Sequence, residues 1–117
     1  MRRREKGGLI GTVFSVNGIP IRLTEERWSH IVEHHPEIEQ FLDEILSTVS
    51  NPKNMYLLTK KQILAATNTY DKLETFGLAK NIAVHYREFA HDGFILTAFV
   101  ISDKKLERRF RNWKRLK

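Results

Sequence analysis

The sequence predicts one α+β domain, in which an N-terminal hairpin and two helices pack on an antiparallel β-sheet (meander) and a C-terminal amphipathic basic helix follows. Three observations lead to this prediction. Six short β-type runs are separated by turn signals, two apolar stripes with helical spacing lie between residues 24 and 50, and a third stripe follows residue 102. The 117 residues are within the usual size range of one domain.

The composition narrows the class of protein. Hydrophobic residues make up 41% of the chain and charged residues 29%, which is typical of a globular protein rather than a disordered one. There is no cysteine, which excludes a disulfide scaffold, a thiolate nucleophile and a cysteine-based metal site. No apolar run approaches the ~20 residues of a membrane span, and no long apolar stretch follows the basic start. We therefore expect a cytoplasmic protein without membrane contact.

The positive charge lies at the two ends of the sequence. The net charge is +6, but residues 1–6 carry +3 and residues 103–117 carry +6, so the middle of the chain is mildly acidic at −3. We expect residues 1–8, which end in two glycines, to form a flexible basic arm before a single domain over 9–117. Such ends can attract a polyanion, or simply keep the protein soluble.

A hairpin is predicted first. Residues 9–16 and 19–23 are β-type runs joined by Asn17-Gly18, and Asn-Gly is a strong hairpin signal because a type I′ turn needs φ > 0 at both central residues. Pro20 cannot donate a hydrogen bond to a neighbouring strand, so its run is predicted to be an edge strand.

Two helices should follow the hairpin. Thr24 is the predicted N-cap of the first, and its apolar stripe at i, i+3, i+4, i+7 comprises Trp28, Ile31, Val32 and His35. Pro36 disfavours helical geometry at His35 and suits the first turn of a second helix, which ends at Asn51-Pro52. That helix repeats the stripe with Ile38, Phe41, Leu42 and Ile45.

The following residues are rich in β-type runs. The predicted strands are 55–58, 63–70, 82–89 and 94–101, with residues 71–81 as a loop. For the last hairpin we expect a three-residue loop over 91–93 with Gly93 in the left-handed conformation. This register places Arg87 opposite Thr97 and His85 opposite Phe99.

The last predicted element is a helix capped by Ser102. Its apolar positions Leu106, Phe110 and Trp113 recur at i, i+4 and i+7, and basic residues surround them. The apolar stripe should dock on the domain and leave a cationic outer face.

Three of the five histidines lie within a stretch of six residues, 30–35, in the predicted first helix. His30 and His34 share a face with Arg27, whereas His35 lies at the helix end, nearer the apolar stripe. These residues are interpreted as surface and packing histidines, as a zinc site, or as acid–base catalysts. A zinc site lacks an evident third ligand, and Ile31 stands where the HExxH motif has glutamate.

The strand hairpin offers complementary groups. His85 and Arg87 alternate onto one face of their strand, with Thr97 on the paired strand. A solvated sheet face is the ordinary interpretation of such a pattern. If the histidine-bearing helix covers this face, however, a cleft would hold a proton-transfer group, a cation and a hydroxyl. Cleavage of RNA by its own 2′-hydroxyl needs these groups and requires neither a metal nor a cofactor.

Two segments resemble a known family. The stretch LTEERWSHI at residues 23–31, followed by HPE at 35–37, resembles the opening helix of the phage-associated barnase–EndoU–colicin E5/D–RelE-like (BECR-fold) nucleases. The TAF at residues 97–99 is similar to the "TAY"-like motif of their late strand. Phe99 stands where that family has tyrosine, and His34 stands where arginine is common.

The resemblance implies a metal-independent endoribonuclease, toxin-like or phage-linked, with 9–117 as a single nuclease-like domain. RNA would be its partner, and the resemblance also implies an antitoxin or immunity protein as an inhibitor. The expected catalytic residues are His30, His35, Arg87 and Thr97. The residues expected to contact the substrate are Arg27, His34, His85 and Tyr86.

Two other functions remain open from the sequence. The chain could be a non-catalytic nucleic-acid-binding module that uses its basic ends. It could also be an interaction domain of the toxin–antitoxin type, in which Phe110 and Trp113 are buried against another chain.

Overall fold

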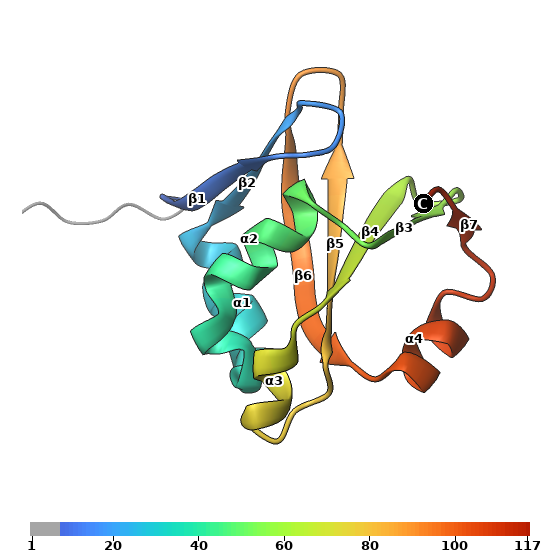
Figure 1. Ribbon diagram of the computed structural model, residues 1–117. Coiled ribbons are helices and arrows are strands. Elements are labelled where there is room, and N and C mark those ends of the chain that lie inside the picture. Colours follow the sequence, from blue (N-terminus) through green and yellow to red (C-terminus); the bar gives the residue numbers. More distant parts are fainter. Residues whose placement is uncertain (1–7) are drawn as a thin grey trace, which may run out of the picture.

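The computed structural model describes residues 8–117, which form an α+β fold with a seven-stranded mixed sheet (Figure 1). The predicted arm over 1–8 lies almost entirely outside the described residues. The strands are β1 (Leu9–Phe14), β2 (Pro20–Thr24), β3 (Asn54–Leu58), β4 (Ile63–Thr69), β5 (Asn81–Glu88), β6 (Gly93–Ile101) and β7 (Lys114–Arg115). The helices are α1 (Glu25–His34), the 3-10 helix η1 (Pro36–Phe41), α2 (Leu42–Ser50), α3 (Asp71–Thr75) and α4 (Asp103–Arg109).

The sheet has the order β1-β2-β6-β5-β4-β3-β7. Strands β3 to β6 form the predicted antiparallel meander. The prediction of a wholly antiparallel sheet is wrong at β2, which runs parallel to β6 and pairs with it only at Ile21 and Arg22. Beyond Arg22 the chain leaves β6 and enters α1, so the helix runs beside the open edge of β6 (Figure 1).

The first hairpin is present, but its loop is longer than predicted. β1 and β2 pair antiparallel, with Phe14 opposite Pro20, so five residues connect the strands. Gly18 has φ +76°, whereas Asn17 has no positive φ, so the turn is not of type I′. Pro20 does not lie on an edge strand, since β1 forms the edge. It is tolerated because it is the first residue of β2.

The helices α1, η1 and α2 cover one face of the sheet. The Thr24 hydroxyl accepts a hydrogen bond from the backbone N–H of Arg27 at 3.1 Å and caps α1, as predicted. The helix ends where Pro36 follows, and the second helical segment begins with η1 before α2. Its apolar side chains fill the core against the sheet, and the fully buried ones among them are Ile38, Phe41, Ile45 and Val49. The predicted loop over 71–81 contains the short helix α3.

The β5–β6 hairpin has a different register from the one predicted. Glu88 pairs with Gly93 across a four-residue loop, and a bulge at Leu96 shifts the pairing further along β6. His85 therefore lies opposite Thr97, and Arg87 lies opposite Phe94. Gly93 is required for a different reason than expected. It has no positive φ, but a Cβ there would lie 2.1 Å from the carbonyl oxygen of Arg87.

A second, smaller core lies on the other face of the sheet. Helix α4 ends at Arg109, earlier than predicted, and Phe110 then packs on Tyr56 with the rings stacked 4.7 Å apart. Phe110 is only 3% exposed. The hypothesis that Phe110 is buried against another chain is therefore wrong, because this ring is buried within its own chain.

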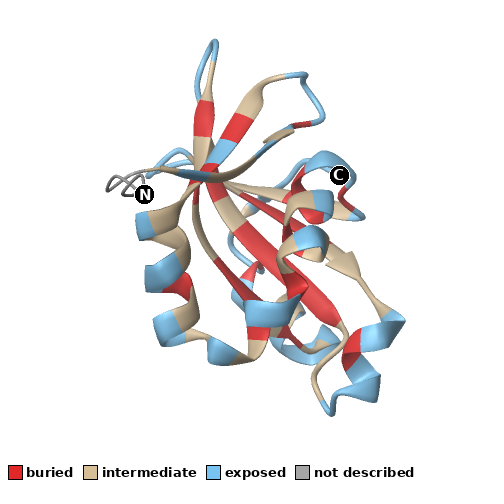
Figure 2. Cartoon of the chain, turned by 90° about the vertical axis from the view of Figure 1, so that its left-hand side faces the viewer, coloured by how far each residue is buried: buried red, intermediate tan, exposed pale blue. Residues whose placement is uncertain are grey.

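Buried residues lie mostly on the strands and the inner sides of the helices, while most loop residues are exposed or half-buried (Figure 2). Within residues 8–117, none of the helices has the length and apolar character needed to cross a membrane.

Candidate active site

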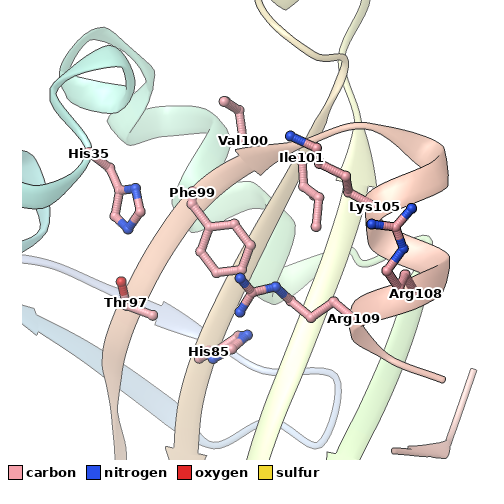
Figure 3. A pocket seen from close by; sticks show the side chains of 9 residues that line it. All are labelled: His35, His85, Thr97, Phe99, Val100, Ile101, Lys105, Arg108 and Arg109. Carbon is pink, nitrogen blue, oxygen red and sulfur yellow. The ribbon is translucent and has the colours of Figure 1, made fainter. Parts of the chain in front are cut away.

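A cavity of about 650 Å³ opens over β6, between the end of α1 and helix α4 (Figure 3). Three elements contribute to its wall. Its lining residues are His35 after α1, His85 on β5, Thr97, Phe99, Val100 and Ile101 on β6, and Lys105, Arg108 and Arg109 on α4.

His35 reaches the cavity because α1 ends there. Its backbone N–H donates to the carbonyl of Ile31 at 2.8 Å and its φ of −135° takes it out of the helix before Pro36. The imidazole then lies 5.7 Å from the ring of Phe99, and Nδ1 is 3.8 Å from a carboxylate oxygen of Glu37. Figure 3 shows the ring on the same side of the cavity as the Thr97 hydroxyl. His35 is one-third exposed, so its imidazole can meet a substrate.

His85 and Thr97 face the cavity together because the bulge at Leu96 pairs them across β5 and β6. The imidazole of His85 is surrounded by aromatic rings: Phe99 at 5.3 Å, Trp113 at 5.2 Å and Phe110 at 5.9 Å between centroids. Its Nε2 is buried and has no hydrogen-bond partner among the described residues. The β6 bulge and this aromatic shell therefore hold the imidazole in the cavity wall, with its Nε2 buried and unpaired within that described part of the chain.

Burial favours the neutral form of the His85 imidazole. Removal from water is the larger cause and the positive charge of Arg109 the smaller one, and together they lower the pKa of His85 to about 4. The guanidinium of Arg109 lies 4.6 Å from the centre of the Phe99 ring, a cation–π contact. The Phe99 ring thus lies between the imidazoles of His35 and His85, and the Arg109 guanidinium lies over its face (Figure 3).

Helix α4 is held in place at its first turn. The Ser102 hydroxyl accepts a hydrogen bond from the backbone N–H of Lys105 at 3.3 Å. The carboxylate of Asp103 accepts from the Asn81 amide at 2.8 Å and lies 3.2 Å from the Lys80 ammonium. These two partners, Asn81 first, lower the pKa of Asp103. The contacts fix α4 to the start of β5, and Lys105, Arg108 and Arg109 then face the cavity.

Two further hollows continue the site along α1. The second hollow, of about 290 Å³, is lined by Arg27, His30, Ile31, His34, His35, Leu96 and Thr97. The third hollow, of about 260 Å³, is lined by Thr24, Glu26, Arg27 and His30. His30 and His34 are exposed, with their rings 5.0 Å apart, and His34 Nδ1 donates to the carbonyl of His30 at 2.9 Å.

The structure brings together some of the residues predicted for the site and separates others. His35, Thr97 and His85 line the cavity, and His30, His34 and Arg27 line the second hollow beside it. Arg87 lies two residues beyond His85 on β5, and its predicted position opposite Thr97 is wrong because of the bulge and the longer loop.

Tyr86 is separated from the cavity. Its side chain is fully buried in the core beneath the helices, on the opposite face of the sheet from His85. Burial, and secondarily the charge of Glu88, raise the pKa of its hydroxyl.

The cations of α4 were missed by the sequence prediction. The sequence indicates only a basic end with a cationic outer helix face at residues 103–117, yet Lys105, Arg108 and Arg109 form one wall of the cavity. A signal was present, since these residues are spaced i, i+3 and i+4 and so share one helix face behind the Ser102 cap. The cationic end and the histidines therefore belong to the same site.

No family model, curated protein or solved structure matches the chain. Across residues 8–117 there is no group of three or more histidine, aspartate or glutamate side chains placed to hold a metal ion. The polar groups that line the cavity are two imidazoles, one hydroxyl and three cations.

Proposed function

We propose that this protein is a metal-independent endoribonuclease, toxin-like or phage-linked, which cleaves RNA by attack of a 2′-hydroxyl on the adjacent phosphate. One observation carries the proposal: two imidazoles, a hydroxyl and three cations line a single cavity. The resemblance of residues 23–37 and 97–99 to BECR-fold nucleases supports it. A cytoplasmic location, where RNA substrates are found, follows from the same proposal.

The two imidazoles divide the proton transfers. His85 lines the cavity and its lowered pKa favours the neutral imidazole, so we assign it the role of accepting the proton of the 2′-hydroxyl. A phosphate bound beside Arg109 offsets that cation and raises the pKa of His85, which makes the imidazole a better base. His35 is the more exposed ring and donates a proton to the leaving 5′-oxygen.

The remaining groups stabilise the transition state. As the 2′-oxygen bonds to phosphorus and the bond to the 5′-oxygen breaks, negative charge develops on the two other phosphate oxygens. Arg109 supplies a fixed positive charge for them, and the Thr97 hydroxyl donates a hydrogen bond that orients the phosphate. The products are a 2′,3′-cyclic phosphate and a free 5′-hydroxyl. The role first assigned to Arg87 therefore passes to Arg109.

The test is RNA cleavage in EDTA with analysis of the ends. Purified protein should leave 2′,3′-cyclic phosphates, and a 2′-deoxy substitution at the cut site should abolish cleavage. His35→Ala and Arg109→Ala should each lower kcat by about 10²-fold or more, because each removes one proton-transfer or charge-stabilising group. His91→Ala, which changes an exposed histidine in the β5–β6 loop, is the matched control. A requirement for added metal, or wild-type rates in both site variants, would refute the mechanism.

A second function is favoured by the cations of α4. A non-catalytic module would bind RNA or DNA through Lys105, Arg108 and Arg109, with strong salt dependence and no turnover. The same cleavage assay separates the two functions, since only the endoribonuclease produces cyclic phosphate ends.

A further inference from the structure

The three hollows adjoin one another and share lining residues, and together they are called the groove below. Arg27 and His30 line both the third and the second hollow, and His35 and Thr97 line both the second hollow and the cavity. The groove therefore runs from the start of α1, along the open edge of β6, to α4. It exists because β2 pairs with β6 at only two positions and then leaves the edge of β6 to the helix.

Positive side chains lie at both ends of the groove. Arg27 lies at the α1 end, and Arg108 and Arg109 lie at the α4 end. Three imidazoles of the α1 segment lie between them. Glu26, which lines only the third hollow, is the one acidic residue in the three lining sets. This charge pattern fits a chain of phosphates rather than a single small anion.

The length of the groove indicates how much of such a chain it can hold. Arg27 and His35 are eight residues apart, about 12 Å along the helix axis, or three to four stacked nucleotides at about 3.4 Å each. The α4 cations extend the groove on the other side of Thr97. A dinucleotide would occupy the cavity alone and leave Arg27 without a phosphate.

The site also distinguishes single strands from duplexes. Thr97 and His85 lie on the sheet floor, between α1 and α4, so a phosphate must enter a concave space to reach them. A flexible strand can enter such a space and can align its 2′-oxygen, phosphorus and 5′-oxygen for in-line attack. The regular geometry of an A-form duplex keeps these three atoms out of line and presents a broad, stiff surface.

We propose that the groove binds a single-stranded RNA segment several nucleotides long, with the scissile phosphate at Thr97. The flanking nucleotides on one side lie along α1, held by Arg27, His30 and His34, and those on the other side lie along α4. Arg27 is thus a binding residue for the flanking strand, distant from the reacting atoms. This inference rests on the proposed function.

The kinetic test compares substrates of different length. A single-stranded RNA 12-mer should be cleaved with a kcat/KM at least tenfold above that of a dinucleotide, and above that of the same sequence annealed into a duplex. Arg27→Ala should lower kcat/KM several-fold more for the 12-mer than for the dinucleotide. Arg22→Ala removes the same charge from β2, outside all three hollows, and should change neither. Equal losses of kcat/KM on both substrates, or equal cleavage of duplex and single strand, would contradict the binding of a single-stranded RNA segment in the groove.

A binding test is independent of cleavage. Fluorescence anisotropy with a 2′-O-methyl RNA 12-mer, which cannot be cut, should show that Arg27→Ala reduces the slope of log affinity against log salt by about 0.7, the value for one phosphate contact of a single strand. Arg22→Ala should keep the wild-type slope. If the wild-type protein shows this binding but cuts no RNA, the proposed endoribonuclease function is wrong and RNA binding in the groove is supported. If Arg27→Ala keeps the wild-type slope, Arg27 does not contact the strand and the proposed binding in the groove is wrong, whether or not RNA is cut.

Discussion

His85 should make the fold sensitive to acid. In the unfolded chain this imidazole has the ordinary histidine pKa of 6.5, whereas in the folded protein its pKa is about 4. Between these two values the unfolded state binds more protons, so lowering the pH favours unfolding. The contribution of neutral His85 is fully present above pH 6.5 and is lost as the pH falls toward 4. The whole shift corresponds to about 3 kcal/mol, of which roughly 2 to 3 kcal/mol is lost by pH 4.5.

Urea denaturation at pH 7.5 and at pH 4.5 measures this loss. His85→Gln cannot titrate, so the free energy of unfolding should fall by about 2 to 3 kcal/mol less in this variant than in the wild type. Any constant cost of the glutamine cancels, because each protein is compared with itself at the two pH values. His30→Gln changes an exposed imidazole and should behave as the wild type. If the wild type and His85→Gln lose equal stability, the imidazole is not held neutral by its aromatic shell.

Two packing predictions follow from the same structure. Gly93→Ala should cost about 2 kcal/mol or more in urea denaturation, because its Cβ would meet the backbone oxygen of Arg87 at 2.1 Å. Gly11→Ala should cost clearly less, since the nearest atom there, at 3.1 Å, belongs to a movable leucine side chain. An equal cost at both sites would contradict the close approach at Gly93. Phe110→Ala should lower stability by about 3 kcal/mol or more, whereas Phe14→Ala, at a ring that is 62% exposed, should stay within about 0.5 kcal/mol. A small loss for Phe110→Ala would mean that the second core is not formed.

The first helix could be predicted closely because its signals are local. The Thr24 cap, the apolar stripe and the break before Pro36 act within a few residues of one another. The same locality explains why His35 could be placed at the helix end. Its contact with Phe99, by contrast, depends on how the helix meets β6.

The strand register could not be predicted because non-local packing decides it. A three-residue loop with Gly93 in the left-handed conformation satisfies the local turn rules, yet the chain uses four residues and a bulge at Leu96. Likewise, no local sequence signal near Ile21 indicates a parallel pairing with β6, whose residues come some 70 positions later. These long-range pairings decide that His85, rather than Arg87, faces Thr97.

The charge composition of the sequence does not predict that the α4 cations line the site. A basic run at one end of a sequence commonly means a solvated tail, and charge arithmetic treats residues 103–117 as separate from the acidic middle. In the fold, residues 103–117 are not separate from the rest of the domain, because Phe110 packs on Tyr56 and α4 therefore lies beside the sheet. Arg109 is then a neighbour of residues that precede it by more than twenty positions.

The late position of residues 103–117 also has a consequence for how the protein is made. These residues supply the α4 cations, two rings of the His85 shell and β7, which pairs with β3 at Tyr56 and Leu57. A chain emerges from the ribosome with its N-terminal residues first, so strands β1 to β6 and all of α1 can fold before this segment appears. A nascent chain at that stage has the histidines but lacks Arg109. On the proposed function, the nascent chain therefore cannot cut RNA before residues 103–117 have been translated.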